Sequence, residues 1–372
     1  MPAVQKLLIY RFGQIGDTIA ALPSLWLLRE TFQSAHFTLL SEVPQHGNHL
    51  PPEQILPPQG LVQHYIKYHG GSSLWRVLSM LGTAMSLSRM KFDAVAYLLP
   101  SIRSPKQRLR DAWFFRLAGI KHTIGFEGYP DDPFLRSADG TLAPVMHEAD
   151  ALLKRLAASG LPAINPGEGC MDMGITAEEH ARADAWWANH EGSSLAPRGW
   201  FAVCAGSKWS SKQWPAERYF EVGKQLIDEH GLLPVIFGGN EDRELGQKLI
   251  GRWGTGLCAA GDLTVRESAA LLRGAALYLG NDTGVMHLAA AMGTPCVGIF
   301  SSIDWPGRWF PYGQGHQVIR HEVPCAGCMS AFCSQNILCL TSIQVDRVMS
   351  ACQKVLIKTR NRSVPIDHDA SL

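Results

Sequence analysis

Residues 281–287, NDTGVMH, combine side chains that could bind a sugar carrying phosphate. They follow an apolar strand pattern and precede a run of small residues typical of a helix. Backbone N–H groups and the dipole at a helix N-terminus favour anions. Asp282 could therefore hold sugar hydroxyls, while Thr283 and Gly284 could contact phosphate. His287 lies one turn into the expected helix and is a further candidate for the donor site, although a histidine there more commonly packs or caps.

A second loop with phosphate-binding character spans residues 205–215, AGSKWSSKQWP, after an apolar strand pattern. It supplies small residues, hydroxyl groups and two lysines just before an expected helix. Hydroxyl and amide donors together with a lysine charge suit a phosphate group. We expect Lys212 to make the charge contact and Ser207 a hydroxyl contact. An ordinary solvated loop between strand and helix is the alternative.

Two glycines end a third strand pattern, in residues 237–243, FGGNEDR. A carboxylate at such a strand end can accept hydrogen bonds from the hydroxyls of a nucleotide ribose. Glu241 or Asp242 is expected to take that role. The alternative is helix capping by Asn240 and Glu241.

Near the N-terminus, residues 11–17, RFGQIGD, follow the first strand pattern. Gly13 and Gly16 allow a tight turn and the close approach of a ligand. Asp17 falls at the start of the following helix, where a capping carboxylate is common. An ionised aspartate there could also act as a general base, and the two roles are compatible.

A run of basic residues lies further along the first half of the chain. Arg103 and Lys106 are expected to attract an acidic acceptor, although a solvated helix face would look the same. The run comprises Arg103, Lys106, Arg108, Arg110, Arg116 and Lys121.

Four cysteines fall within a short segment near the C-terminus: Cys325, Cys328, Cys333 and Cys339. Zinc and iron–sulfur sites use four thiolates, so the segment could bind metal. The spacing lacks the usual second C-x-x-C pair, which leaves free thiols or local packing as open alternatives. Cys204 and Cys296 lie inside apolar strand patterns and are expected to pack in the core.

Composition restricts the class of protein. A length of 372 residues predicts about two domains. Hydrophobic residues make up 46%, charged residues 18%, and the net charge is +1, which argues against a disordered chain and against a nucleic-acid partner. We expect no cleavable signal peptide and no membrane-spanning helix. The nine cysteines are an odd number and accompany no export signal, which favours the reducing cytoplasm.

Strand and helix patterns alternate through both halves of the chain and predict parallel sheets with right-handed crossovers. Residues 160–174, rich in Gly and Pro, read as a linker. We expect an α/β protein of two Rossmann-like domains facing a cleft, at residues 1–165 and 175–340. Residues 341–372 would form a C-terminal helix and tail, which could pack back on the first domain.

Together these motifs resemble the bacterial ADP-heptose:lipopolysaccharide heptosyltransferase family, glycosyltransferase family 9. The resemblance rests on residues 16–23 (GDTIAALP), 206–215, 237–239 and 281–287, with residues 311–313 (PYG) and the cysteine segment adding to it. It implies the glycosyltransferase B fold, with the second domain binding ADP-heptose and the first binding a lipid-linked oligosaccharide acceptor. It also implies catalysis without a metal, and a peripheral position at the inner face of the cytoplasmic membrane.

The same resemblance assigns roles to individual residues. Asp17 would be the general base of an inverting transfer of heptose to the lipopolysaccharide inner core. Lys212, Ser207, Thr283 and Gly284 would contact the donor diphosphate, and Asp282 the heptose. Two other enzyme classes remain open: a heptosyltransferase acting on an autotransporter adhesin with metal at the cysteine segment, and a sugar-nucleotide epimerase of the same fold. A non-enzymatic nucleotide-sugar binding protein is a third alternative.

Overall fold

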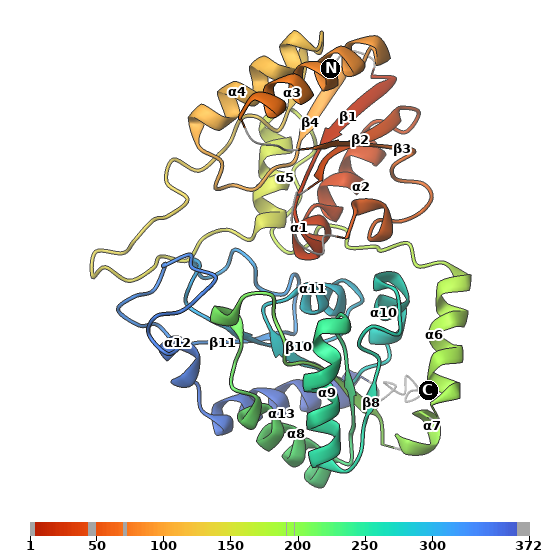
Figure 1. Cartoon of the computed structure of the whole chain (residues 1–372), viewed down its shortest axis with the longest axis vertical. Coiled ribbons are helices and arrows are strands. Elements are labelled where there is room, and N and C mark those ends of the chain that lie inside the picture. The colour runs from red at the N-terminus through yellow and green to blue at the C-terminus, as the bar shows by residue number, and fades with distance from the viewer. Residues whose placement is uncertain (1–3, 44–49, 70–72, 191, 197, 363–372) are drawn as a thin grey trace, which may run out of the picture. The chain divides into compact units, whose positions relative to one another are not determined.

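The computed structural model describes residues 4–43, 50–69, 73–190, 192–196 and 198–362. The chain forms two compact units (Figure 1). The first unit comprises Met1–Arg136, Ala143–Ile175 and Gly307–Tyr312; the second comprises Ser137–Leu142, Thr176–Pro306 and Gly313–Leu372. The main division between Ile175 and Thr176 directly follows the expected linker.

The first unit is built on a parallel sheet of five strands in the order β3-β2-β1-β4-β5. Its central strand is fully apolar from Leu7 to Ile9, as expected for a strand covered on both faces. The strands are β1 (Lys6–Tyr10), β2 (His36–Val43), β3 (His64–His69), β4 (Ala94–Tyr97) and β5 (His122–Ile124).

Helices cover both faces of this sheet (Figure 1). α3 and α4 pack together on one face over a core that includes Leu87 and Phe115. α2 and α5 pack together in the other layer. The helices are α1 (Ile15–Ala20), α2 (Leu22–Thr31), α3 (Ser73–Met90), α4 (Pro105–Leu117) and α5 (Glu148–Ala158), with a 3-10 turn η1 (Pro52–Gln54).

The second unit repeats this plan around six parallel strands in the order β11-β10-β9-β6-β7-β8. The strands are β6 (Trp200–Cys204), β7 (Leu233–Ile236), β8 (Leu257–Cys258), β9 (Tyr278–Asn281), β10 (Cys296–Phe300) and β11 (Gln317–Arg320). The helices are α6 (Ala177–Asn189), α7 (Gly192–Leu195), α8 (Ala216–His230), α9 (Asn240–Trp253), α10 (Val265–Leu272), α11 (Gly284–Ala291), α12 (Leu338–Thr341) and α13 (Val345–Arg362), with a 3-10 turn η2 (Ser210–Lys212).

The C-terminal helix α13 belongs to the second unit. It packs there against α8, β10 and β11. Val348, Cys352 and Val355 are buried in the same apolar core as Val222 of α8. The reason is the apolar stripe of α13, which fills the face of the second sheet that α8 leaves open.

Other boundaries differ from the sequence patterns in ways that follow from local chemistry. Residues 18–31 have helical spacing, and Pro23 predicts a kink or a short opening turn before the main helix. The structure has a short helix α1 and a longer helix α2, which meet at Ala21. Residues 44–60 are rich in Pro and His and read as a loop, and the first part of this segment, 44–49, lies outside the described residues. Within the described part of the chain, no helix is long and apolar enough to cross a membrane.

Candidate functional site

Asn281, the last residue of β9, organises the loops at one end of the second sheet. Its side-chain oxygen accepts hydrogen bonds from the Trp214 backbone N–H (3.1 Å) and the Tyr219 hydroxyl (2.8 Å). Its amide nitrogen donates to the carbonyls of Ala205 (2.7 Å) and Gly206 (3.2 Å). The side chain is completely buried. One amide group therefore joins the loop after β6 to the carboxyl end of β9, so that the two expected donor motifs become neighbours.

The next residue, Asp282, forms the charged centre of this site. The Lys212 ammonium lies 2.5 Å from Asp282 Oδ2, and His287 Nε2 lies 3.8 Å from Asp282 Oδ1. The side chains of Lys212 and Asp282 are 21% and 11% exposed, whereas that of His287 is 6% exposed. The lysine and the aspartate are therefore accessible to a ligand, while His287 is placed to orient Asp282 from behind.

The loop that carries Lys212 is held from two sides. The Gln213 side chain donates to the Ser207 carbonyl at 2.7 Å, which closes the loop on itself. The Ser211 hydroxyl donates to the Ser330 carbonyl at 2.6 Å, and its N–H donates to the Ala331 carbonyl at 3.2 Å. Ser207 is half-buried in this loop. The cysteine-bearing segment therefore supports the position of Lys212.

Thr283 and Gly284 begin helix α11 beside this charged pair. Thr283 is the N-cap residue, but its side chain does not cap the helix. The hydroxyl instead donates to Cys204 Sγ at 3.7 Å and lies 3.3 Å from the Tyr278 hydroxyl. The backbone N–H groups of the first turn thus donate no hydrogen bond to the Thr283 side chain, which leaves this side chain out of the way of an anion. Burial, followed by the charge of Asp242, raises the pKa of the Cys204 thiol to about 12, so this thiol is neutral.

Asp242, rather than Asn240 or Glu241, caps helix α9. Its carboxylate accepts the Gly239 N–H at 2.9 Å. The sequence had suggested Asn240 and Glu241 as the capping residues. Burial raises the pKa of Asp242 above its ordinary value. A Cβ atom at Gly206 would lie 1.7 Å from Asp242 Oδ1, so the glycine lets the loop after β6 approach α9. Glu241 is exposed at the same helix end.

Asp17 lies in the first unit, in the first turn of α1. Its carboxylate accepts the Gln14 N–H at 2.9 Å, and Oδ1 lies 3.4 Å from Arg11 Nη2. Arg11 also donates to the Asp17 carbonyl and to the Leu98 carbonyl. The arginine side chain is 1% exposed and that of Asp17 is 23% exposed. A Cβ atom at Gly13, whose φ is +143°, would lie 2.5 Å from Asp17 Cβ. The N-cap residue of α1 is Gln14 and not Asp17, which is the third helical residue and accepts the N–H of the N-cap residue.

The two expected acceptor residues lie in different environments at the N-terminal end of α4. Arg103 Nη2 lies 2.7 Å from Asp111 Oδ2, and its side chain is 14% exposed. Asp111 also accepts the Tyr97 hydroxyl at 2.7 Å. Lys106 is exposed. Arg103 is thus held inside the first unit, whereas Lys106 is accessible to a ligand.

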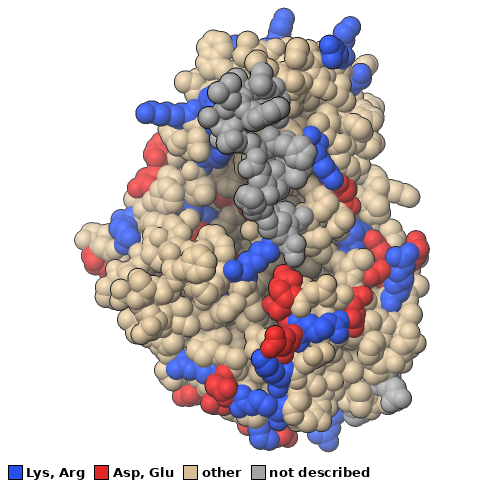
Figure 2. Space-filling view, in the orientation of Figure 1, with Lys and Arg blue, Asp and Glu red and all other residues tan. Residues whose placement is uncertain are grey.

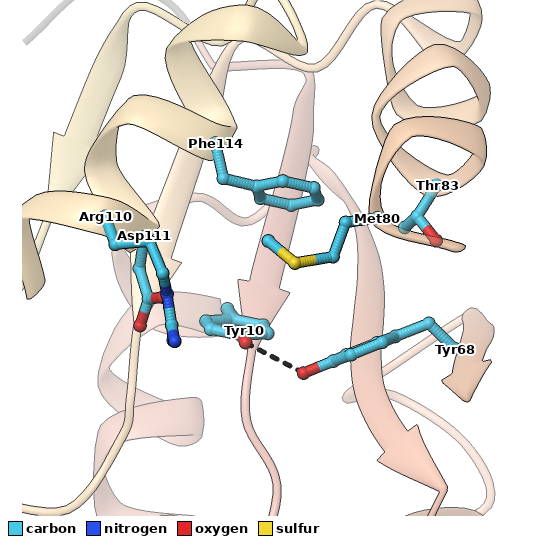
Figure 3. Close-up of a pocket in the computed structure, with 7 residues that line it drawn as sticks. All are labelled: Tyr10, Tyr68, Met80, Thr83, Arg110, Asp111 and Phe114. Carbon is cyan, nitrogen blue, oxygen red and sulfur yellow. Dashed lines mark hydrogen bonds and ion pairs between the residues drawn. The ribbon is translucent and has the colours of Figure 1, made fainter. Parts of the chain in front are cut away.

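A small pocket lies between α3, α4 and the first sheet (Figure 3). The Tyr10 and Tyr68 hydroxyls are 2.9 Å apart at one side of it, and Met80 and Phe114 stand opposite. Asp111 joins this pocket to Arg103. Burial raises the pKa of Tyr10 well above its ordinary value, which keeps this hydroxyl protonated.

The cysteine segment is a series of tight turns. Cys325 and Cys328 are exposed, Cys333 is half-buried and Cys339 is buried. Cys333 Sγ accepts the backbone N–H groups of Gln335 and Ile337, both at 3.3 Å. Among the described residues, no group of three or more His, Cys, Asp or Glu side chains is arranged to hold a metal ion.

The structure thus brings Lys212, Asp282 and His287 together, with Ser207, Thr283 and Gly284 on the adjoining loops. Asp242 and Glu241 lie at the amino end of α9, which Gly206 connects to the same loops. Two important residues were missed: Asn281 as the buried hub and Arg11 as the partner of Asp17. Arg11 directly follows the apolar run of β1, and a charged residue in that place could have indicated a buried ion pair. The Asn281 contacts had no such signal.

In open α/β sheets such as these two, ligands bind outside the carboxyl ends of the strands, where the polar loops of this chain lie. The sequence model of glycosyltransferase family 9 (heptosyltransferase) matches residues 85–338. The chain belongs to this family. It is therefore a glycosyltransferase.

Two relatives illustrate the likeness in sequence. Lipopolysaccharide heptosyltransferase 1 of Pseudomonas aeruginosa is 23% identical over 95% of this chain and 98% of its own length. Lipopolysaccharide heptosyltransferase 2 of Escherichia coli is 33% identical, over 32% of this chain and 35% of its own length. This match spans about a third of the Escherichia coli protein.

Solved structures show the same fold. A family 9 glycosyltransferase from Veillonella parvula has a TM-score of 0.71 at 19% identity and covers 96% of this chain and 99% of its own. ADP-heptose heptosyltransferase II of Escherichia coli has a TM-score of 0.63 at 20% identity, again over 96% of this chain and 99% of its own. The fold of this protein is the glycosyltransferase B fold of the heptosyltransferases.

Proposed function

We propose that this protein transfers heptose from ADP-heptose to a sugar of the lipopolysaccharide inner core. Membership of the heptosyltransferase family supports the reaction class. A relative of matching length, from Pseudomonas aeruginosa, is a lipopolysaccharide heptosyltransferase. The Escherichia coli heptosyltransferase WaaC, which shares the fold, was solved with ADP-2-deoxy-2-fluoro heptose.

The observation that carries the proposal is the paired Lys212 and Asp282 beside the first turn of α11. In open α/β sheets, ligands bind at the carboxyl ends of strands. Both residues follow such ends, those of β6 and β9, and Asn281 fixes the two loops to each other. A cation, a carboxylate and a helix N-terminus that its N-cap side chain does not cap provide what a diphosphate attached to a sugar needs. We assign the donor to the second unit.

Individual contacts follow from these positions. Lys212 would contact the diphosphate, with Ser207, Thr283 and Gly284 supplying hydroxyl and backbone donors. Asp282 would accept from the heptose hydroxyls, with His287 orienting it. Glu241 is the exposed carboxylate for the ribose. Asp242 supports that end of α9, since its own carboxylate already accepts the Gly239 N–H.

In the proposed mechanism, Asp17 removes a proton from the acceptor hydroxyl. The hydroxyl oxygen attacks the anomeric carbon as the bond to ADP breaks on the opposite side, which inverts the configuration. The transition state has oxocarbenium character, as in other glycosyl transfers. Lys212 and the α11 N-terminus stabilise the charge that develops on the leaving diphosphate, usually the largest catalytic contribution. The reaction as proposed requires no metal.

The acceptor would be bound by the first unit, with Lys106 as the accessible cation and Arg103 held behind it by Asp111. A lipopolysaccharide precursor is lipid-anchored and acidic, so basic residues suit it. The enzyme would then work in the cytoplasm, at the inner face of the cytoplasmic membrane.

Incubation with ADP-heptose and a panel of truncated lipopolysaccharide cores, followed by mass spectrometry, tests the proposal. The expected result is one added heptose on one core and no loss of activity in EDTA. Transfer to a polypeptide would indicate an adhesin-modifying enzyme, and a product from ADP-heptose alone would indicate an epimerase. Tight binding of ADP-heptose without any product would indicate a binding protein. Each of these three results would contradict the proposal.

A further inference from the structure

The outward face of helix α4 carries an apolar stripe. Leu109, Trp113 and Leu117 follow one another at intervals of four residues, which places them on one side of the helix. They are 61%, 57% and 75% exposed, respectively. Asp111 and Phe115, on the opposite side, are buried against the sheet. The stripe therefore points away from the body of the first unit.

The neighbouring helix α3 extends this apolar surface. It packs beside α4, and it carries Leu81 and Met85 at the same spacing, 53% and 56% exposed. Single exposed apolar residues are normal on soluble proteins, but a contiguous patch marks an interaction site. These two neighbouring helices together expose five large apolar side chains.

The charges around the stripe are almost all positive. Arg116 and Arg110 flank it on either side of the helix, and Arg110 is also paired with Asp111. Lys106 lies at its N-terminal end. The sequence of α3 contains no Asp or Glu, and the one acidic residue of α4, Asp111, is buried. Figure 2 shows blue side chains among tan atoms in the upper region, where Figure 1 places α3 and α4.

We propose that the Leu109–Trp113–Leu117 face of α4 docks the protein onto an anionic lipid bilayer. An apolar stripe with tryptophan, bordered by arginine and lysine, is the composition of a helix that lies in the membrane interface. Long basic side chains can keep their charges at the headgroups while the stripe is buried. A second copy of this chain would instead bring the same arginines against each other, which disfavours a symmetric dimer through this face.

This inference rests on the proposed function, because docking is useful to an enzyme whose lipid-anchored acceptor lies at the membrane surface. Docking would raise the local concentration of the acceptor without touching the sugar that reacts. Changes in the stripe should therefore lower turnover on an acceptor embedded in vesicles and should not lower turnover on an acceptor freed of its acyl chains. This difference separates a failure of docking from a failure of the reaction.

Vesicle flotation with the full-length protein tests the inference. We expect binding to vesicles of phosphatidylethanolamine and phosphatidylglycerol, and at least about tenfold weaker binding to pure phosphatidylcholine. Trp113→Ala/Leu117→Ala should weaken binding to the anionic vesicles by at least about tenfold. Arg116→Glu changes only a flanking charge. It should weaken binding to the anionic vesicles about fivefold or more, and the binding that is left should depend less on salt concentration.

Ile357→Ala is the matched control, because Ile357 of α13 is an isolated apolar residue that is 60% exposed. It should bind vesicles like the wild type. Unchanged thermal midpoints would show that all variants are folded. The docking variants should keep full turnover on deacylated core oligosaccharide, and lose it on core lipid in anionic vesicles.

Equal binding of wild type and Trp113→Ala/Leu117→Ala to anionic vesicles would overturn the inference. So would a wild-type dimer in sedimentation that the double variant converts to monomer, since another copy would then cover the stripe. If the wild type binds anionic vesicles as described but transfers no heptose to any core, the docking surface stands and the proposed reaction fails.

Discussion

Lys212 and Asp282, 70 residues apart in the chain, form an ion pair of 2.5 Å between Nζ and Oδ2. Partly exposed pairs of this kind contribute only about 0–1 kcal/mol to stability. The pair is better understood as a preformed binding site. It holds the lysine over the loop end and keeps the carboxylate oriented, so that a ligand meets both groups already in place.

Lys212→Met should therefore damage catalysis far more than stability. We expect kcat/KM for ADP-heptose to fall by about a hundredfold or more, because the charge that stabilises the leaving diphosphate is lost. The thermal midpoint should change little. Lys208→Met, on an exposed lysine of the same loop, is the control and should retain activity. Equal losses in the two variants would argue against a specific role for Lys212.

Asp17→Asn should strongly reduce turnover while leaving ADP-heptose binding nearly intact. A general base contributes about 10²- to 10⁴-fold, so kcat should fall within that range. Calorimetry with ADP-heptose measures the binding and a coupled assay measures turnover. Near-normal kcat in this variant would remove Asp17 from the mechanism.

The comparison needs a control for stability, because Asp17 is also the partner of the buried Arg11. Asp93→Asn provides one: Asp93 accepts the N–H groups of Gln5 and Lys6, both at 2.8 Å, within the same unit. Both variants should lose stability, by about 1–3 kcal/mol for a weakened charged hydrogen bond. Asp93→Asn should retain the kcat of the wild type at temperatures where it is folded.

Asn281→Leu should be strongly destabilising. The substitution removes an acceptor for the Trp214 N–H and the Tyr219 hydroxyl and leaves the Ala205 carbonyl without its donor. A buried polar group left unsatisfied costs about 1–3 kcal/mol, so we expect a loss of at least about 3 kcal/mol in urea unfolding. Tyr219→Phe removes a single bond and should cost about 1 kcal/mol. A loss no larger than that in Asn281→Leu would contradict the role of hub.

His147 predicts a dependence of stability on pH. Its Nδ1 accepts the Ala149 N–H, and Nε2 donates to the Phe310 carbonyl, so the ring is neutral. Burial lowers its pKa below 6.5 in the folded state. As the pH falls below 6.5, His147 is protonated in the unfolded chain and stays neutral in the folded chain. The free energy of unfolding therefore decreases until the pH reaches the lowered pKa of the folded state.

The loss amounts to about 1.4 kcal/mol for each unit of lowering. His147→Asn keeps a capping acceptor and does not titrate, so unfolding measured between neutral and mildly acidic pH should show a smaller slope than in the wild type. Identical slopes in the two proteins would show that His147 is not the group responsible.

The cysteines should separate into two reactivity classes. Burial raises the pKa of Cys204 to about 12 and that of Cys296 above its ordinary value, so both should resist iodoacetamide in the native state. Cys325 and Cys328 are exposed and should be alkylated first. Peptide mapping by mass spectrometry measures this order. Early modification of Cys204 would show that the second sheet opens locally.

Much of the architecture could be predicted because buried parallel strands are continuous apolar runs. β1 and β6 are such runs: every residue of β6 is buried, and in β1 only Lys6 is exposed. The edge strands β8 and β11 do not stand out in the sequence, since one has only two residues and the other is partly buried with polar ends. A strand this short or this polar lacks the continuous apolar run by which a buried parallel strand is recognised.

The site was predictable to the extent that it depends on strand ends. Lys212 and Asp282 could be expected near each other because both follow parallel strands of one sheet. The contacts of Asn281 with Tyr219, and of Arg11 with Asp17, depend on side-chain directions that periodicity does not contain. For the same reason the capping residue of α9 was assigned to its neighbours instead of Asp242.

The short segment Gly307–Tyr312 belongs to the first unit although it lies late in the chain. The Tyr312 hydroxyl donates to Asp150 at 2.7 Å and accepts the Gly169 N–H at 3.0 Å, and the Arg308 carbonyl accepts the Glu148 N–H. A chimera that exchanges acceptor domains between family members by a single crossover near residue 175 would separate these partners. A chimera that folds should therefore take residues 307–312 from the same family member as its N-terminal half, although they are encoded within the C-terminal half.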